Sequence, residues 1–555
     1  MKKILVLLLT ILLILSVVPK QTAAAGFPDV PSSHRFYEDI MYLLQKEVIT
    51  SSNRFGIEDY VTREEVAVMV GKARGLSGGK VTTPFKDVPS SLASSGYINS
   101  AYREGIIQGF PDGTFRPKEI VTRGQMAIFL SRAFGMPAGK TVNFKDMSPK
   151  VSSYNAVNQI LAANITTGFP DNTFRPNEKL RRGQIAAFLS RAIQFFEVKV
   201  HFINVGQGDS ILIQSPNGKN MLIDGGTKSA GTKVVSFIKS KGITKLDYVV
   251  ATHPDADHIG GLISVLNSFP VGTFIDSGKS HTTETYYELL NLIDVKNIPF
   301  KVPTEGEEIA LDKNFNLQVL NAAKASDDTN EASLVLNLTY NKEAFLFMGD
   351  ADTQTEADLV ARYDLKSTVL KAGHHGSSTS TSQLFVNEVK PATTILSYGK
   401  DNSYGHPHSE VVNRLKAAGS KIFNTVDHCD ISVLTSGFGH TVSNTCTPTT
   451  TPPPATSTAV KIVSKDLSTE IVGIKNTGST TVNITDWTLV SVNGNQTYKF
   501  PSYNLAAGKT VYVTSGPNAK SATGYLKWTT ANIWLNSGDP AKLLNAQGAV
   551  VSELQ

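Results

Sequence analysis

The chain has 555 residues, which is enough for three or four domains. Its formal net charge of +5 is only mildly basic, so it permits binding to a polyanion but does not identify one. Beyond the N-terminus, no apolar run approaches the roughly 20 residues that cross a bilayer, and the sequence therefore excludes a membrane channel.

Residues 1–25 have the pattern of a secretory signal peptide. A Lys-Lys pair precedes an apolar run from Ile4 to Val18, and three alanines come before Gly26. A basic segment, an apolar segment and small residues at a cleavage site define this class of leader. The run is short for a membrane anchor, although a retained anchor is the alternative. We therefore expect a secreted mature chain without a transmembrane segment.

The next part of the chain, to about residue 194, repeats with a period near 59 residues. The loop Gly-Phe-Pro-Asp-Gly-Thr-Phe-Arg-Pro at 109–117 recurs at 168–176 with one change, and Thr-Arg-Gly-Gln at 122–125 recurs as Arg-Arg-Gly-Gln at 181–184. In the first copy the loop is degraded to the unrelated segment 53–60. A fixed period of this length indicates repeated units, here each a helix, a turn-rich loop and a second helix.

These units resemble α-helical S-layer homology repeats. The resemblance implies attachment to the cell wall or S-layer through a secondary cell-wall polysaccharide, held in grooves between repeats. It places Arg123 and Arg182 in the motif that meets acidic groups of this polymer, with Arg63 of the degraded repeat as a lesser candidate. A guanidinium fork suits a carboxylate, although these arginines could instead cap or pair on a helix. We expect the units at 26–84, 85–143 and 144–196.

A short segment after the repeats is rich in metal-binding side chains. Within 252–261, two imidazoles and two carboxylates occupy six positions, as His253, Asp255, Asp257 and His258. An apolar run precedes them, as expected for a buried strand that delivers ligands onto the loop at its end. Imidazole and carboxylate suit Zn²⁺ or Mn²⁺, and alternating ligands can serve two ions. The alternative is a polar turn with unlinked residues.

Three further apolar runs end in the same way. Asp224 follows 220–223, Asp350 follows 344–349, and the pair His374-His375 follows 368–373. An α/β scaffold builds a site in this manner, along one edge of its sheets.

Residues 197–445 resemble the metallo-β-lactamase fold, an αββα sandwich, and more narrowly the nuclease-like domain of the ComEC competence-protein family. Six segments occur in the family's order: Val-Gly-Gln-Gly-Asp-Ser (205–210), Leu-Ile-Asp-Gly-Gly (222–226), Thr-His-Pro-Asp-Ala-Asp-His (252–258), Phe-Met-Gly-Asp-Ala-Asp (347–352), Gly-His-His-Gly-Ser (373–377) and Tyr-Gly-His-Pro-His (404–408).

The resemblance implies two divalent ions, Zn²⁺ or Mn²⁺. The first would be held by His253 and Asp255, with Asp350 bridging to the second. Asp255 stands where many members carry His, which makes the site richer in oxygen and admits Mn²⁺. A usual histidine ligand is missing between 281 and 374; Asn330 resembles the family's substitute, but whether it is a ligand stays open.

The second ion would be held by Asp257, His258 and His374. His375 could exchange roles with His374, because the sequence does not say which imidazole points inward. Asp224 would orient the histidine ligands from outside the coordination sphere.

Two such ions activate water and clamp phosphoryl oxygens, so the site needs no serine or cysteine nucleophile. Asp257 is essential to this chemistry in our interpretation. Tyr404, His406 and His408 carry proton-donating side chains and could serve the leaving oxygen, although a His beside Pro is often only a turn residue. Further phosphate contacts are expected from Ser377, Ser378 and Asn402.

The last part of the chain begins with a Thr/Pro-rich stretch at 446–459, which we expect to be an extended spacer. Just before it, Cys429 and Cys446 are the only cysteines. In an exported chain they could form a disulfide, whose closed loop would contribute roughly 3 kcal/mol.

Residues 460–555 resemble the lamin-tail domain, an immunoglobulin-like β-sandwich. The resemblance rests on short alternating runs between Gly and Asn turns, among them 471–478, 486–489, 505–508 and 534–539. We expect core positions, more than a ligand platform, for Trp487, Trp528 and Trp534.

The leading hypothesis is a wall-anchored extracellular metal-dependent phosphodiesterase, a nuclease acting on extracellular DNA. The alternatives are a phosphodiesterase on teichoic-type wall polymers and a non-catalytic wall-binding structural protein. A β-lactam hydrolase is disfavoured, because Asp255 replaces a histidine and another ligand is missing.

Overall fold

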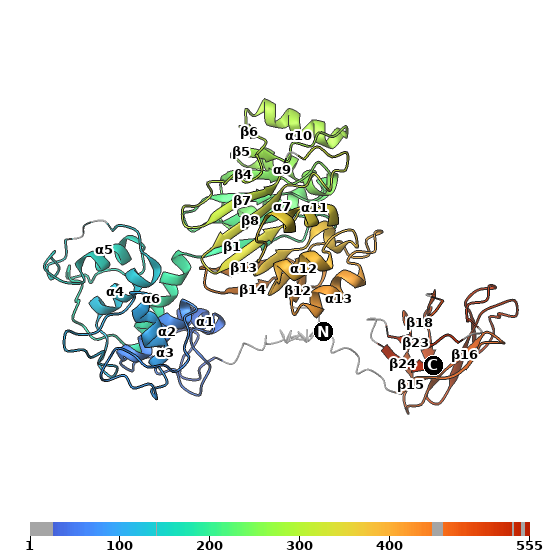
Figure 1. Ribbon diagram of the computed structural model, residues 1–555, viewed down its shortest axis with the longest axis horizontal. Coiled ribbons are helices and arrows are strands. Elements are labelled where there is room, and N and C mark those ends of the chain that lie inside the picture. Colours follow the sequence, from blue (N-terminus) through green and yellow to red (C-terminus); the bar gives the residue numbers. More distant parts are fainter. Residues whose placement is uncertain are drawn as a thin grey trace, which may run out of the picture. The chain divides into compact units, whose positions relative to one another are not determined.

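The computed structural model describes residues 26–446 and 459–554, except 140, 142, 323, 495, 536–537 and 546–549. The expected signal peptide at 1–25 and nearly all of the expected spacer, 447–458, lie outside the described residues. The chain divides into two compact units between Cys446 and Thr447. We name its parts the repeat domain (26–196), the central domain (197–446) and the C-terminal domain (459–554), which are coloured in this order in Figure 1.

The repeat domain contains three pairs of helices. These are α1 (Tyr37–Gln45) and α2 (Arg63–Ala73), α3 (Ser95–Arg103) and α4 (Arg123–Phe134), α5 (Tyr154–Ala162) and α6 (Arg182–Phe195). The repeated motif begins the second helix of each pair. At α2, the Thr62 hydroxyl accepts from the Glu65 N–H while the Glu65 carboxylate accepts from the Thr62 N–H, a capping box that satisfies two exposed donors.

The three repeats are joined in a ring. Isolated β-bridges pair Thr62 with Ile120, Thr122 with Lys179, and Tyr60 with Arg181, so each repeat bonds to both others. The loop before each capped helix therefore lies against the turn-rich loop of the next repeat.

The central domain consists of two β-sheets that pack face to face. The first has the order β14-β13-β1-β2-β3-β4-β5-β6 and the second β12-β11-β10-β9-β8-β7. Apolar side chains of both, such as Val200 and Val250 from one and Phe345 and Val369 from the other, form one core between them. The strands are β1 (Val198–Phe202), β2 (Ile211–Gln214), β3 (Asn220–Ile223), β4 (Leu246–Ala251), β5 (Val271–Asp276), β6 (Phe300–Lys301), β7 (Asn316–Asn321), β8 (Val335–Tyr340), β9 (Glu343–Phe347), β10 (Val369–Lys371), β11 (Thr393–Leu396), β12 (Lys421–Asn424), β13 (Ile431–Thr435) and β14 (His440–Asn444).

Helices cover the outer face of each sheet. Val234, Leu262 and Leu289 bring α7 (Gly231–Ser240), α9 (Leu262–Ser268) and α10 (Glu284–Val295) onto the first sheet. Leu359, Phe385 and Val411 bring α11 (Thr353–Arg362), α12 (Gln383–Val389) and α13 (Ser409–Ala417) onto the second. The four layers are the αββα sandwich that the sequence predicts. Short helical turns complete the domain: η1 (Lys228–Ala230), α8 (Ala256–Ile259), η2 (Gly373–Gly376) and α14 (Thr425–His428).

Parallel strands dominate the middle of both sheets. β3, β4 and β5 are parallel neighbours in the first sheet, and β9, β10, β11 and β12 in the second. Their carboxyl ends therefore meet at one edge of the sandwich, which is where open α/β sheets place their sites. The predicted disulfide between Cys429 and Cys446 is present and closes the β13–β14 hairpin.

The C-terminal domain is built of strands alone among its described residues. Two four-stranded sheets, β15-β16-β21-β22 and β19-β18-β23-β24, accompany the pair β17-β20. Trp487 and Trp534 are buried in its core and Trp528 packs against it, in keeping with the expected core role. The strands are β15 (Val460–Asp466), β16 (Ile471–Asn476), β17 (Val482–Asn483), β18 (Thr488–Ser491), β19 (Gln496–Lys499), β20 (Asn504–Leu505), β21 (Thr510–Thr514), β22 (Tyr525–Lys527), β23 (Ala541–Leu544) and β24 (Val550–Leu554).

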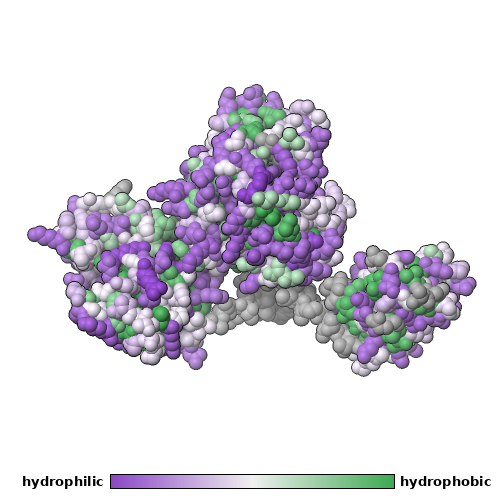
Figure 2. Space-filling view, in the orientation of Figure 1, coloured by the Kyte–Doolittle hydropathy of each residue, from purple (hydrophilic) through white to green (hydrophobic). Residues whose placement is uncertain are grey.

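Figure 2 shows a mostly hydrophilic surface over the repeat and central domains. Across the described ranges, every helix falls short of the length and apolar character that a transmembrane span requires.

Candidate metal centre and wall-binding groove

The predicted site residues converge at the carboxyl edge of the central domain. Asp224 follows β3, the segment 253–258 follows β4, Asp350 follows β9, and the pair His374-His375 follows β10. Residues far apart in the sequence therefore meet because parallel strands end together. Their side chains form the candidate metal centre.

Three ligand atoms lie at the mutual separations that one tetrahedral ion requires, and a fourth lies near one of them. The Nε2 atoms of His258 and His375 are 3.4 Å apart, and they lie 3.4 and 3.3 Å from Oδ2 of Asp350. Oδ2 of Asp257 is 3.5 Å from Nε2 of His375. Ligands bonded tetrahedrally at about 2.0–2.1 Å are themselves about 3.3–3.4 Å apart, so His258, His375 and Asp350 fit a divalent ion, with Asp257 next to them as the candidate fourth ligand.

A second set surrounds His253. Its Nε2 lies 3.9 Å from Oδ2 of Asp350 and 3.8 Å from Oδ2 of Asp255. Nε2 of His253 and Oδ1 of Asp350 are buried and have no hydrogen-bond partner among the described residues. Since buried polar atoms are nearly always satisfied, a ligand role explains both. The arrangement therefore fits a second ion that shares Asp350 with the first.

The structure distinguishes the two neighbouring histidines. His375 is buried within the cluster, whereas Nε2 of His374 lies 4.0 Å from Asp350 and a quarter of its side chain is exposed. Both have left-handed backbone angles, φ 55° and 45°, a strained conformation for any residue but glycine. The geometry favours the alternative assignment, with His375 as the ligand and His374 at the rim; ligation itself stays a prediction.

Asp224 orients two of the imidazoles. Its Oδ2 lies 2.8 Å from Nδ1 of His258 and accepts from the Thr252 hydroxyl at 2.7 Å, while its Oδ1 accepts from the Thr252 N–H. The Thr252 hydroxyl in turn lies 3.1 Å from Nδ1 of His253. A carboxylate on Nδ1 fixes the tautomer and leaves Nε2 for a metal, which is the role predicted for Asp224.

Asp209 is a site residue that the sequence reasoning missed. It is buried in one group with His258, Asp350 and His375. Its Oδ2 pairs with Lys371 at 2.7 Å, and its Oδ1 lies 3.6 Å from Nδ1 of His375. Burial raises the pKa of Asp209, but the Lys371 ammonium outweighs it and the pKa falls to about 2. Nδ1 of His375 is held by the Ser397 carbonyl at 2.9 Å, and Asp209 lies behind the ring as an ionised neighbour. Its place in the Gly-Gln-Gly-Asp-Ser segment was the available signal.

The carboxylates also set the charge of the imidazoles. Burial lowers the pKa of His258, but the neighbouring Asp350 and Asp224 outweigh it and raise the pKa well above its usual value. His253 differs, since burial and the adjacent His258 lower its pKa to about 4. The cluster thus collects negative charge around imidazoles, as a cation site requires.

The loop between β11 and α13 forms one wall of the site. Asn402 donates to the carbonyls of Gly399 and His406 and accepts from the His406 N–H, so its amide is engaged in holding the loop. This engagement argues against the phosphate contact predicted for Asn402. Nδ1 of His408 accepts from the Ser378 N–H at 2.8 Å, and Ser377 is buried beside Thr379.

His406 and Asn330 are two further predicted residues; the first lies beside the histidine pair and the second lies in a turn near Asp255. The His406 ring centroid lies 5.5 Å from that of His374, and burial with the neighbouring histidines lowers the pKa of His406 to about 4. It is therefore neutral and can offer an N–H to an oxygen. Asn330 lies in a turn where its N–H donates to Asp328, and the adjacent Thr329 bonds to Asp255.

The predicted wall-binding arginines fall into two groups. Arg123 is buried; its Nε donates to the Phe174 carbonyl and its Nη2 to the Thr167 carbonyl. Arg63 makes the corresponding bonds to Phe115 and Gln108 of the next repeat. These arginines join neighbouring repeats through buried side chains. Their contact with a polymer stays a prediction, which this internal role disfavours.

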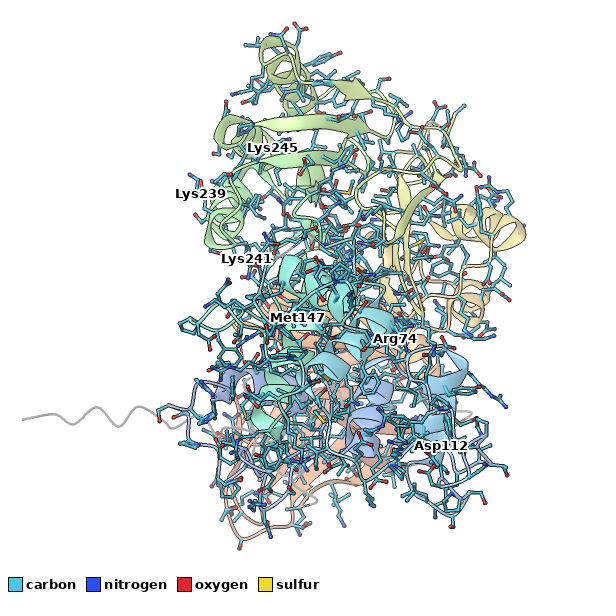
Figure 3. All side chains as sticks on the ribbon, turned by 90° about the vertical axis from the view of Figure 1, so that its left-hand side faces the viewer. Arg74, Asp112, Met147, Lys239, Lys241 and Lys245 are labelled. Atoms are coloured by element: carbon cyan, nitrogen blue, oxygen red, sulfur yellow. A yellow bond between two sulfur atoms is a disulfide. The ribbon has the colours of Figure 1, made fainter. Side chains whose placement is uncertain are left out.

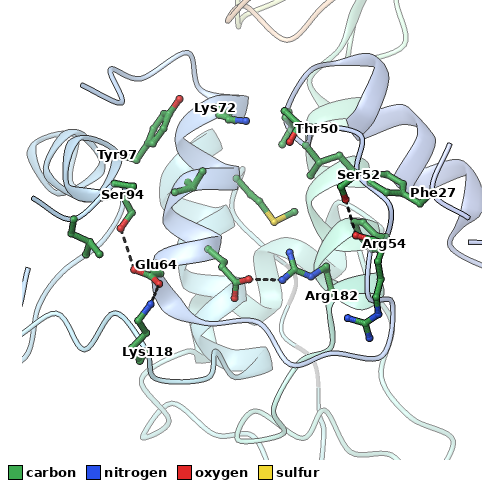
Figure 4. Close-up of a pocket in the computed structure, with 18 residues that line it drawn as sticks. Phe27, Thr50, Ser52, Arg54, Glu64, Lys72, Ser94, Tyr97, Lys118 and Arg182 are labelled. Carbon is green, nitrogen blue, oxygen red and sulfur yellow. Dashed lines mark hydrogen bonds and ion pairs between the residues drawn. The ribbon is translucent and has the colours of Figure 1, made fainter. Parts of the chain in front are cut away.

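Arg182 instead lines an open groove. A cavity of about 650 Å³ lies between α2, α3, the first residue of α6 and the loop that follows α1, with Arg182, Arg54, Lys72 and Lys118 among its lining residues (Figure 4). Arg182 pairs with Glu65, and its buried Nε has no hydrogen-bond partner among the described residues. This groove has the cations and the depth to bind an acidic sugar.

Comparison with known proteins agrees with this architecture. Family models match as follows: S-layer homology domain at 26–67, 84–127 and 143–186, metallo-beta-lactamase superfamily at 203–400, and Lamin Tail Domain at 453–555.

Three relatives illustrate the similarity. Over 260 residues the chain is 32% identical to competence protein ComA of Neisseria gonorrhoeae, covering 45% of this chain and 34% of that protein. Over 250 residues it is 30% identical to ComE operon protein 3 of Bacillus subtilis, covering 41% and 32%. The repeat domain is 28% identical over 150 residues to the cellulosome-anchoring protein of Acetivibrio thermocellus, covering 25% and 33%. The chain thus spans about a third of the length of each relative. It comprises three S-layer homology repeats, a metallo-β-lactamase superfamily domain similar to part of these competence proteins, and a lamin tail domain.

Proposed function

We propose that the central domain is a metal-dependent phosphodiesterase that cleaves extracellular DNA, in a secreted protein attached to the cell wall or S-layer. The observation that carries the proposal is the buried cluster around Asp350, with ligand atoms at tetrahedral separations and with His253 Nε2 and Asp350 Oδ1 left without protein partners. When bound, two divalent ions, Zn²⁺ or Mn²⁺, supply Lewis acidity towards phosphoryl oxygens and a water of lowered pKa.

The protein's own residues would divide the work as follows. Asp257, His258 and His375 hold one ion, and His253 with Asp255 holds the other, with Asp350 shared. The Asp224 carboxylate and the Ser397 carbonyl fix the imidazoles of His258 and His375 from behind, so that little reorganisation accompanies the reaction.

Proton delivery falls to the two histidines of the loop beyond β11. Nδ1 of His408 accepts a backbone hydrogen bond from Ser378, so its proton resides on Nε2 and is available to an oxygen. His406, buried beside His374, can hold a non-bridging or leaving oxygen through its N–H.

A nucleic-acid substrate is supported by the similarity to competence protein ComA. Lys239, Lys241 and Lys245 lie on one side of the central domain (Figure 3). They precede the amino end of β4, at the opposite edge from the metal centre, so the proposal does not rest on them.

Attachment to the wall is proposed for the repeat domain. The groove around Arg182 would take acidic groups of a secondary cell-wall polysaccharide. Four cationic side chains line it, of which Arg54, Lys118 and Arg182 would exchange their present carboxylate partners for the ligand. A phosphodiesterase held there would also lie next to teichoic-type polymers, which makes them the second candidate substrate.

A digestion panel separates the candidates. The full chain, reconstituted with Zn²⁺ or Mn²⁺, is offered single- and double-stranded DNA, RNA, teichoic acid and a chromogenic phosphodiester, with Asp257→Asn as the inactive control. We expect DNA cleavage that this variant lacks. Intact nucleic acids together with phosphate-containing products from teichoic acid would replace the nuclease by the second candidate.

A further inference from the structure

Tyr404 presents an aromatic ring to solvent beside the metal centre. Its exposed fraction is 64%, although most large apolar side chains of the central domain are buried. The ring is stacked on that of His406, with centroids 5.5 Å apart and planes 20° apart. One face of Tyr404 is therefore covered and the rest of the ring remains open.

The loop that carries Tyr404 is held on both sides. Asn402 makes three hydrogen bonds across it, two as donor and one as acceptor from the His406 N–H. The His408 N–H donates to the carbonyl of Gly376, next to the histidine pair. The exposed ring is thus fixed in place, and a fixed platform binds without a large ordering cost.

A short path of rings connects this platform with the reacting centre. The His406 ring lies 5.5 Å from that of His374 and 6.2 Å from that of His375. His375 reaches Oδ2 of Asp350 at 3.3 Å. A single intervening ring, that of His406, therefore separates Tyr404 from His375 of the cluster.

We propose that Tyr404 is a stacking platform for a nucleobase next to the scissile phosphodiester, and that the substrate is accordingly an unpaired nucleic-acid strand. This inference rests on the proposed phosphodiesterase function. Enzymes and carriers of single strands stack bases on exposed aromatic rings, whereas bases within a duplex are already stacked on each other. Teichoic-type polymers have no planar ring to place there.

The test compares two single-stranded phosphodiester oligomers of equal length on the metal-loaded full chain. One is oligothymidylate, and the other carries abasic tetrahydrofuran units, so the phosphates match and only the bases differ. We expect wild-type kcat/KM to favour the thymidylate oligomer about tenfold or more. Tyr404→Ala should bring this ratio close to one, whereas Tyr404→Phe, which keeps the ring and loses the hydroxyl, should preserve it.

Each outcome is decisive. Equal cleavage of both oligomers by the wild type, or an unchanged ratio in Tyr404→Ala, overturns the stacking role but leaves the phosphodiesterase intact. Loss of activity on both oligomers in Tyr404→Phe would instead assign the hydroxyl to proton transfer. A wild type that cleaves neither oligomer overturns the proposed function itself. Metal content and melting temperature, measured for both variants, show whether the exposed substitution has disturbed the site.

Discussion

The repeat domain and the central domain both bury charged side chains, but they treat them differently. Arg63 and Arg123 lie among aromatic rings, and each guanidinium donates to two carbonyls of the next repeat. In the metal centre, His253 and Asp350 each keep a buried polar atom without a hydrogen-bond partner among the described residues. Because an unpartnered buried polar group costs stability, it persists where a ligand is to be bound. For these charged groups we apply one criterion: complete hydrogen bonding is typical of an architectural role, whereas a missing partner beside other candidate ligands is typical of a site.

The same criterion separates three arginines that share one motif. Arg63 packs on the loop of the second repeat and Arg123 on that of the third, so the ring of repeats brings Arg182 to the loop of the first. That loop lacks the Gly-Phe-Pro-Asp sequence, and Nε of Arg182 finds no carbonyl there. Degradation of the first repeat has therefore left the third arginine at a groove.

The largest effect is expected from the residue shared by both halves of the metal centre. Asp350→Ala should lower phosphodiesterase activity by at least about 10³-fold and release most of the bound metal, since it removes the bridging carboxylate. Elemental analysis and the digestion assay measure both. Asp352→Ala is the matched control: this neighbour caps α11 through the Thr355 N–H, so only about 1 kcal/mol of stability should be lost. Unchanged metal content in Asp350→Ala would refute the shared ligand.

The sequence predicted the position of the site well, because four apolar runs ending in Asp or His are strand ends of parallel sheets. It could not decide between His374 and His375, which have identical local settings. The choice depends on backbone angles of this turn, and the distant Glu356 holds the segment that follows it through the Ser382 N–H at 2.7 Å. The sequence did not predict Asp209 as a site residue for a similar reason: its role depends on Lys371, which is more than 150 residues away.

The repeats show a different limit. The motif around Arg63, Arg123 and Arg182 is so similar that the sequence placed Arg123 and Arg182 in one role, with Arg63 as a lesser candidate. Their surroundings come from a different repeat in each case, so only the arrangement of the repeats in a ring distinguishes an internal arginine from one at a groove.

The next largest effect concerns the internal arginines. Arg123→Met should destabilise the repeat domain by roughly 3 kcal/mol, because two buried carbonyls lose their donors. The protein that remains folded should still bind purified walls. Calorimetry and a pelleting assay test the two statements, with Arg116→Met, whose ion pairs are exposed, as a control worth less than about 1 kcal/mol. Loss of wall binding without a change in melting temperature would instead show that Arg123 contacts the polymer.

At the groove we expect the opposite result, a loss of wall binding with little loss of stability. Arg182→Ala should weaken binding to purified walls about tenfold while changing the melting temperature little, since its guanidinium pairs only with the half-buried Glu65. Arg181→Ala removes a neighbouring cation outside the groove and should bind as the wild type does. Walls stripped of their secondary polymer by hydrofluoric acid should retain neither protein. Equal retention of the wild type on stripped walls would exclude the polysaccharide as the ligand.

The smallest effect tests a buried charge that the criterion assigns to architecture. Glu356 is fully buried and accepts from the N–H groups of Thr381 and Ser382, which follow the histidine turn. Burial raises its pKa from 4.5 to about 7 in spite of these donors. The folded state therefore binds the proton more tightly than the unfolded chain. The resulting stabilisation is complete below pH 4.5 and is lost as the pH rises through about 7.

Glu356→Gln imitates the protonated form and should remove this dependence. Between pH 5 and 8, the calorimetric transition of the central domain should fall more steeply in the wild type than in the variant, by a few degrees across the range. Glu410→Gln, an exposed carboxylate on α13, should leave the wild-type slope unchanged. Metal content should be the same in all three proteins, because Glu356 touches no proposed ligand. A variant that keeps the wild-type slope would show that Glu356 titrates normally. Loss of metal in Glu356→Gln would instead mean that a buried charge with all its hydrogen bonds made can belong to the metal site. The criterion that separates architectural charges from site charges would then fail at Glu356.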